Sequence, residues 1–228
     1  MNFRYILGAG TIVLLATAPM QATAQFGNLK VPGVPNAFGG GASSSFDLQG
    51  GQAGFFSSFG SAQSQVLQAQ ILLAKAFDLK ELAEALQIEA NYISTGEIDT
   101  QGIKNSMQIS QSANTAVSEK MSEGVELSDE GKEYFIQSLP FLLQGTVLAS
   151  KLPAEAQALA DGVKSTAQNG NMMQKVQAAK LVAPTATVAT AVPGFVRSTF
   201  DCYKKVVSYG QQNNLPIPED ATDALGDL

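Results

Sequence analysis

The sequence predicts an all-α protein, an antiparallel bundle of about six helices that follows a flexible N-terminal arm rich in Gly, Ser and Phe. Two observations predict this fold class. Between residues 61 and 214, apolar residues recur at spacings of three and four in six segments, which is the period of a helix with one buried face. Short turns that contain Gly, Pro or Asn separate these segments, and connections this short favour antiparallel neighbours.

Residues 1–24 have the three-part pattern of a secretory signal peptide. Arg4 lies in a short basic start, residues 6–18 are apolar or small, and Ala22-Thr23-Ala24 is a cleavage motif. The apolar run is short for a membrane span, although an uncleaved anchor is the alternative. We therefore expect an exported protein with its mature N-terminus at Gln25, located in the periplasm or, as the second option, secreted.

The composition narrows the class of function. The chain has 228 residues, enough for one domain with its own core, and a net charge of −6 without a basic cluster. This acidic balance argues against nucleic-acid binding and against adhesion to anionic lipid by charge alone. Cys202 is the only cysteine, so no intrachain disulfide is possible, and a bacterial cell envelope is the expected compartment.

Residues 25–60 are expected to form a flexible arm, because runs of Gly and Ser bury too little apolar surface to offset the entropy of ordering them. Phenylalanines are nevertheless scattered through this stretch. One hypothesis is that the arm docks onto a partner. The other is that it is a tether whose last phenylalanines pack against the bundle. The predicted partner-contact residues are Phe38, Phe46, Phe55, Phe56 and Phe59.

The bundle domain is predicted over residues 61–214 and begins with one long helix, 61–94, that lacks Gly and Pro. Along it, Leu or Ile recurs every seven residues from Leu72 to Ile93, and Ala does so from Ala69 to Ala90. Large and small residues thus alternate along one seam, so a partner helix can approach closely at the alanines. Gly96 is expected to end this helix in a left-handed conformation.

The second helix has a clear start signal and an unusual stripe. Asp99 or Thr100 can cap it, and it is predicted to run to Met121, with Gly124 after its end. Ser110 and Asn114 interrupt its apolar stripe, and a polar residue at such a position can fix the register of packed helices.

Ser128 is the expected cap of a third helix. Residues 134–150 of that helix carry no charge, which is typical of a helix buried on all sides. We therefore expect it to be the central helix of the bundle, with a kink at Pro140.

The remaining segments are bounded by Pro, Gly and Asn. A fourth helix is predicted to start at Pro153 and a fifth to run from its cap at Asn171 to a break at Pro184. A sixth segment contains Pro193, so we expect a kink or two pieces there, and residues 185–192 could instead be extended. Residues 215–228 are predicted to be an acidic, Pro-containing and loosely held tail.

The residue types present exclude most catalytic sites. The absence of His excludes Ser-His-Asp and Cys-His catalysis, so we expect no enzymatic activity, no cofactor and no metal. Cys202 lies on an apolar stripe, which favours an inert buried thiol over a redox role. Glu81 and Glu84 are expected on a solvated face. The carboxylates between 119 and 133 could bind a cation weakly at most, since they lack a calcium-loop motif.

These features favour an exported, non-enzymatic protein that acts by protein–protein contact in the bacterial cell envelope, with an envelope protein or with itself. The alternative is a membrane-active or lipid-binding protein, because residues 134–150 and 181–196 are both uncharged. Both stretches are too short and too polar for a standing span. They are either a pair of buried core helices or helices that can be released onto a bilayer.

Overall fold

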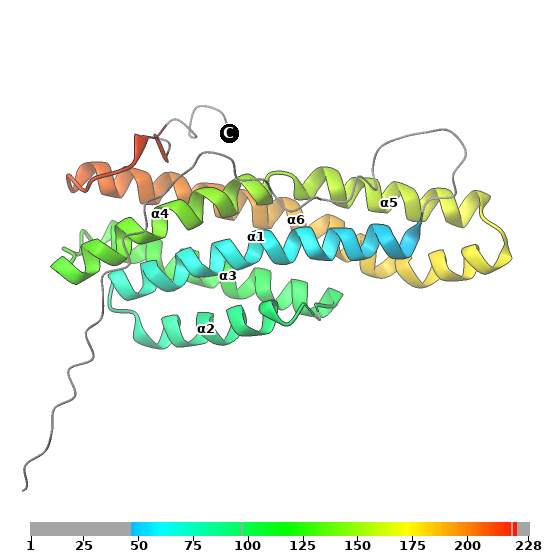
Figure 1. Ribbon diagram of the computed structural model, residues 1–228, viewed down its shortest axis with the longest axis horizontal. Coiled ribbons are helices and arrows are strands. Elements are labelled where there is room, and N and C mark those ends of the chain that lie inside the picture. The colour runs from blue at the N-terminus through cyan, green and yellow to red at the C-terminus, as the bar shows by residue number, and fades with distance from the viewer. Residues whose placement is uncertain (1–46, 97, 220, 223–228) are drawn as a thin grey trace, which may run out of the picture. The chain divides into compact units, whose positions relative to one another are not determined.

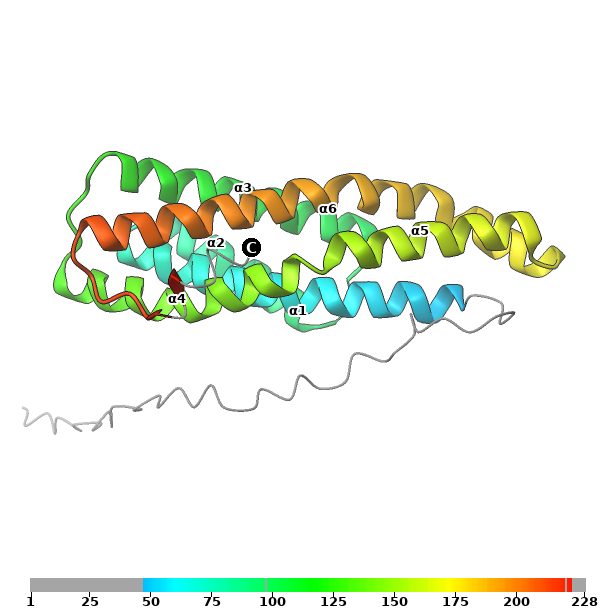
Figure 2. The same cartoon turned by 90° about the horizontal axis from the view of Figure 1, so that it is seen from above.

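A computed structural model describes residues 47–96, 98–219 and 221–222 of the chain. These residues form helices joined by short turns, without a strand, and the all-α bundle predicted from the sequence is confirmed (Figures 1 and 2). The predicted signal peptide, residues 25–46 with Phe38 and Phe46, and residues 223–228 lie outside the described residues. The six helices are α1 Leu48–Ala76, α2 Lys80–Ser94, α3 Thr100–Ser122, α4 Asp129–Ala149, α5 Leu152–Asn169 and α6 Met172–Gln212.

The central helix is α1, which packs against α2, α3, α4 and α5 (Figure 1). The prediction that residues 134–150 form the central helix is wrong. That stretch belongs to α4, which packs mainly on α1 and α6 and leaves Phe141 and Val147 36% and 39% exposed. A segment without charge therefore need not be enclosed, because Gln137, Gln144 and Ser150 give it an exposed polar face.

The helix α1 begins within the predicted arm, so the arm boundary at residue 60 is wrong. Asp47 caps the helix by accepting a hydrogen bond from the backbone N–H of Gln49 at 3.1 Å. Phe55 and Phe59 lie one turn apart and are fully buried, and the Phe59 ring centroid is 5.7 Å from that of Phe195 in α6. The burial of these two rings stabilises a Gly-rich helical turn that composition alone disfavours.

Two of the predicted partner-contact residues thus belong to the core. For Phe55 and Phe59 the docking hypothesis is wrong, because a fully buried ring cannot meet a partner without unfolding, and the alternative of packing against the bundle holds. Phe56 is partly buried against the same cluster.

The predicted single helix over 61–94 is also wrong, because the chain turns at residues 77–79 and α2 folds back along α1 (Figure 1). Asp78 has φ of +54°, a left-handed conformation that Asp tolerates better than most residues. The heptad pattern continues across the turn because Leu86 and Ile93 pack into the same core as α1. Hydrophobic periodicity alone did not reveal the reversal.

The predicted capping signals are confirmed. The side chains of Asp99, Ser128 and Asn171 each accept a backbone N–H bond at the start of α3, α4 and α6. Gly96 and Gly124 adopt positive φ, of 72° and 67°, just after α2 and α3.

The helix α6 runs without interruption from Met172 to Gln212, so the predicted break at Pro184 is wrong. The segment 185–192 is helical as well, and Pro193 lies inside the helix. A proline removes one backbone hydrogen bond, but Val188, Val192 and Phe195 are buried on one face of this helix and hold it against its neighbours.

The described part of the tail is not loosely held. The Tyr203 hydroxyl donates a hydrogen bond to the carbonyl of Ala221, which is 2% exposed. Ile217 lies against Gly210 of α6, so closely that a Cβ added at Gly210 would collide with the Cδ1 atom of Ile217. Leu215 and Ile217 therefore pack against the end of the core to which α4 and α6 contribute.

Replacement of Phe59 by Ala tests whether the helix before residue 61 is part of the core. We expect the free energy of unfolding to fall by about 3–5 kcal/mol, the usual effect of deleting a buried Phe. Phe56→Ala is the control and should cost clearly less, because Phe56 is only partly buried. Urea unfolding followed by circular dichroism measures both, and equal losses would contradict the buried position of Phe59.

A second pair of variants tests the close approach of α1 and α4. A Cβ at Gly145 would lie 2.8 Å from the Cγ2 atom and 3.0 Å from the backbone nitrogen of Val66. Gly145→Ala should therefore destabilise the fold by about 1–3 kcal/mol. At Gly54 an added Cβ meets no atom within 4 Å, so Gly54→Ala should stabilise α1 by about 0.5–1 kcal/mol. Stabilisation by both substitutions would show that the two helices are further apart.

Candidate functional site

A ladder of buried polar side chains joins α1 to α3. The Gln63 Nε2 atom donates to the hydroxyls of Ser106 and Ser110 at 2.8 and 2.7 Å. Seven residues further along α1, the Gln70 Nε2 atom donates to Asn114 Oδ1 at 2.8 Å and to the Ser110 carbonyl at 3.0 Å. All of these side chains are at most 7% exposed. A shift of α3 along α1 would break these bonds and leave buried polar groups unpaired, which is costly.

The polar ladder continues to a third helix and has a structural role. Asn114 Nδ2 donates to the Ser198 hydroxyl of α6 at 3.0 Å. The sequence singled out Ser110 and Asn114 as register-fixing positions, and the structure shows the bonds through which they can act. Most of the hydrogen-bonding capacity of these groups is used within the bundle, so the ladder offers little to a ligand.

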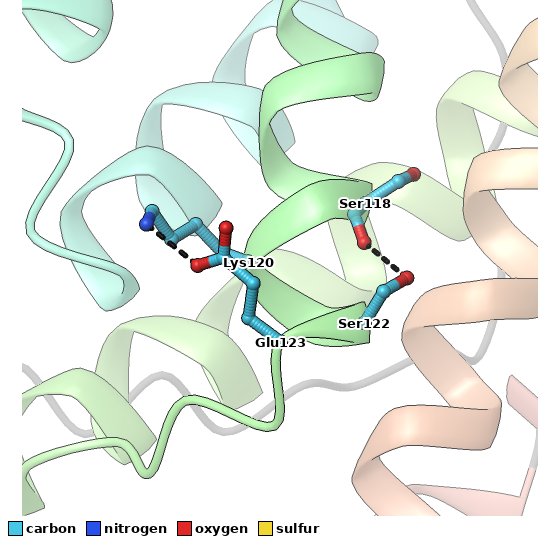
Figure 3. Close-up of polar contacts among 4 residues, drawn as sticks. All are labelled: Ser118, Lys120, Ser122 and Glu123. Atoms are coloured by element: carbon cyan, nitrogen blue, oxygen red, sulfur yellow. Dashed lines mark hydrogen bonds and ion pairs between the residues drawn. The ribbon is translucent and has the colours of Figure 1, made fainter.

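An open groove of about 700 Å³ lies between the C-terminal half of α3 and the middle of α6, which run side by side (Figure 2). On its α3 side the Ser122 hydroxyl donates to the Ser118 carbonyl, while Lys120 pairs with Glu123 at 2.8 Å (Figure 3). Its lining mixes both signs of charge, so it selects neither an anion nor a cation. The charged lining residues are Glu119, Glu123, Arg197, Asp201 and Lys205.

The most exposed apolar surface is at the other end of the bundle, where α5 and the first half of α6 form a hairpin. This hairpin extends past the start of α1 (Figures 1 and 2). Of the eight large hydrophobic side chains that stand out as exposed among the described residues, four lie in the first eleven positions of α6. They are Met172, Met173, Val176 and Val182, with exposed fractions of 85%, 74%, 54% and 50%. We call these four residues the apolar tip.

Charge is distributed unevenly around the apolar tip. Residues 162–200 contain no Asp or Glu, although the chain carries 20 acidic and 14 basic side chains. Within this range Lys164, Lys175 and Lys180 are exposed on the hairpin. An acidic protein thus has one basic and apolar end, which a charge count over the whole chain did not reveal.

The two predicted membrane stretches differ in the structure. In residues 181–196, one face is buried through Val188, Val192 and Phe195, whereas Val182 and its neighbours on the other face are exposed. Of the described helices, α6 is the one whose length and mean hydropathy, 1.3 over 18 residues, would allow a membrane crossing, and 22% of that window is buried. In residues 134–150, Phe141 and Val147 are partly exposed.

The exposure of Met172, Met173 and Val176 was not predicted from the sequence, because these residues precede the uncharged stretch that begins at residue 181. Lys175 and Lys180 interrupt the hydrophobic run there, so a search for uncharged stretches passes over it. The useful signal would have been the absence of carboxylates across residues 162–200.

Among the described residues, no three His, Cys, Asp or Glu side chains come together in a way that could hold a metal ion. In comparisons with protein-family models, curated proteins and solved structures, no match to this chain was found.

Cys202 is 2% exposed, and burial raises the pKa of its thiol to about 12, with a small opposing effect from Lys205. The folded thiol therefore keeps its proton at pH values where the thiol of the unfolded chain, with an ordinary pKa of 9.0, begins to ionise. As a consequence, this group lowers the free energy of unfolding as the pH rises above 9.

The thiol should react at least ~100-fold more slowly with iodoacetamide in the folded protein than in urea at pH 8, because burial suppresses both its ionisation and its access. Mass spectrometry of the alkylated chain measures the rate. Equally fast alkylation in the two states would contradict the buried position of Cys202 and would reopen the redox hypothesis.

Proposed function

We propose that the protein acts in the bacterial cell envelope by binding to membrane surfaces, without catalysis, and that the apolar tip of the α5–α6 hairpin is the surface that binds. The observation that carries this proposal is the exposure of Met172, Met173, Val176 and Val182 at one end of α6. Met172 and Val176 lie one turn apart on one exposed face of the helix, and Met173 and Val182 flank that face on opposite sides. An exposed apolar face commonly indicates an interaction surface.

The energetic scale supports reversible attachment. Fully burying a Val or Met side chain is worth about 1.5–3 kcal/mol. The four side chains of the apolar tip are already partly covered, so together they supply several kcal/mol on entering the interface. That is enough for attachment to a bilayer surface, and it is far below the effect of a spanning helix.

The packing of α6 supports a surface position over insertion of the whole helix. Its second half contributes Cys202, Tyr203 and Val206 to the core, so that half cannot enter a bilayer without unfolding the bundle. Its first half packs on α5, and its outer face is available. The hairpin can therefore contact lipid while the rest of the bundle stays folded.

A protein partner, or self-association, is the second candidate. The sequence favoured it through the phenylalanines of the arm, but Phe55 and Phe59 are core residues. Its argument now depends on the partly buried Phe56 and on Phe38 and Phe46, which lie outside the described residues. The membrane hypothesis has the exposed surface in its favour.

Flotation with vesicles of bacterial lipid extract tests the proposal. The protein is expressed from the full sequence, so that its N-terminal segment is processed as in the cell. We expect the unchanged protein to float with the vesicles. Met172→Gln combined with Val176→Gln should lower the partition coefficient about tenfold, because two apolar groups leave the interface without any change in charge.

Ile88→Gln is the matched control, since Ile88 of α2 is 72% exposed and lies away from the hairpin. This variant should float like the unchanged protein, and circular dichroism should show that all variants are folded. Failure of the unchanged protein to float would refute the membrane proposal and favour a protein partner. Equal loss from Ile88→Gln would show that the contact is not specific to the tip.

A further inference from the structure

The charge around the hairpin indicates which class of lipid it binds. We propose that the apolar tip is selective for anionic lipid headgroups, which Lys175 and Lys180 contact while the apolar side chains enter the interface. This inference rests on the proposed function, and it adds the chemical class of the ligand.

The positions of the lysines along α6 support this arrangement. Met172, Val176, Ala179 and Ala183 follow one another at spacings of four and three, so they form one stripe along the helix. Lys175 borders this stripe on one side and Lys180 on the other, since they are displaced from it in opposite directions around the helix axis. Lysine stems can lie along apolar surface while their ammonium groups reach the headgroups.

The distribution of charge supports an anionic partner over a neutral one. No carboxylate occurs in residues 162–200 to neutralise Lys175 and Lys180, and neither lysine is paired in an ion bridge within the described structure. The remainder of the chain is acidic and would be repelled by an anionic bilayer. Attraction at one end and repulsion elsewhere orient the protein with the hairpin towards the membrane.

A second copy of the chain is a poorer occupant of this surface. In a two-fold symmetric contact the same patch meets itself. Lysines of both copies would then be brought close together without a carboxylate between them. An anionic lipid surface satisfies the apolar stripe and the lysines together.

A basic residue near an anionic surface usually strengthens membrane binding, and each lysine should raise the partition coefficient about fivefold. Removing two lysines should therefore weaken binding to anionic vesicles about 10- to 30-fold. The effect should disappear at high salt, because salt screens exposed charges.

The experiment compares vesicles of phosphatidylcholine alone with vesicles that also contain phosphatidylglycerol. We expect the unchanged protein to bind the mixed vesicles at least ~10-fold more strongly, and added salt to remove this preference. Lys175→Gln combined with Lys180→Gln should abolish the preference and leave binding to phosphatidylcholine unchanged. Lys80→Gln combined with Lys104→Gln changes the net charge equally on exposed positions of α2 and α3, and it should have no effect.

The possible failures are distinguishable. Equal binding to both vesicle types, or a preference that persists in high salt, would overturn the inference and leave the proposed function standing. An equal effect of the control pair would show that net charge matters and the hairpin lysines do not. Absence of binding to either vesicle type would overturn the proposed function itself, and the inference with it.

Discussion

The close packing of α1 against α4 constrains the rest of the structure. Gly145 allows the backbone of α4 to approach Val66 of α1 so closely that a methyl group would not fit between them. Because α1 also contacts α2, α3 and α5, the position of this one helix decides where most of the others lie. The polar ladder then fixes the register of α3 on α1, since Gln63 and Gln70 each bond to groups at set heights on α3.

The exposed hairpin end is a consequence of this arrangement. The helix α1 begins at Leu48, whereas α5 and α6 continue past its first turn (Figures 1 and 2). Among the described residues, α5 and α6 have only each other to pack against beyond that point, and two helices cannot bury all of their apolar surface. Met172 and Val176 are therefore exposed because of bundle geometry, and their surroundings are basic because no acidic residue occurs nearby in sequence.

Local features could be predicted from the sequence and non-local ones could not. The caps at Asp99, Ser128 and Asn171 were predictable because a side chain bonds to backbone within three residues. The turn at Asp78 was not, because no Gly or Pro marks it and the apolar heptads continue across it. The start of α1 was also hidden, since its Gly-rich sequence folds only when Phe55 and Phe59 are buried by distant helices.

In the candidate site, too, the local features could be predicted from the sequence and the non-local ones could not. The uncharged stretch 181–196 was visible in the sequence, but which of its faces is exposed depends on the packing of α6 against α5. That packing also exposes Met172 and Met173, which lie before the uncharged stretch and at the very start of the helix. The net charge of the whole chain is negative, so it gave no sign that the hairpin end is basic.

The central claim is that the hairpin end enters the membrane interface while the rest of the bundle stays in water. An environment-sensitive dye placed by Val176→Cys or by Ile88→Cys, each in a Cys202→Ala chain, measures this directly on anionic vesicles. At position 176 the emission should shift to the blue and be quenched by a quencher attached to lipid, whereas the dye at 88 should keep its emission in water. A dye at 176 that stays in water on the bound protein, or equal quenching at 88, would contradict the claim.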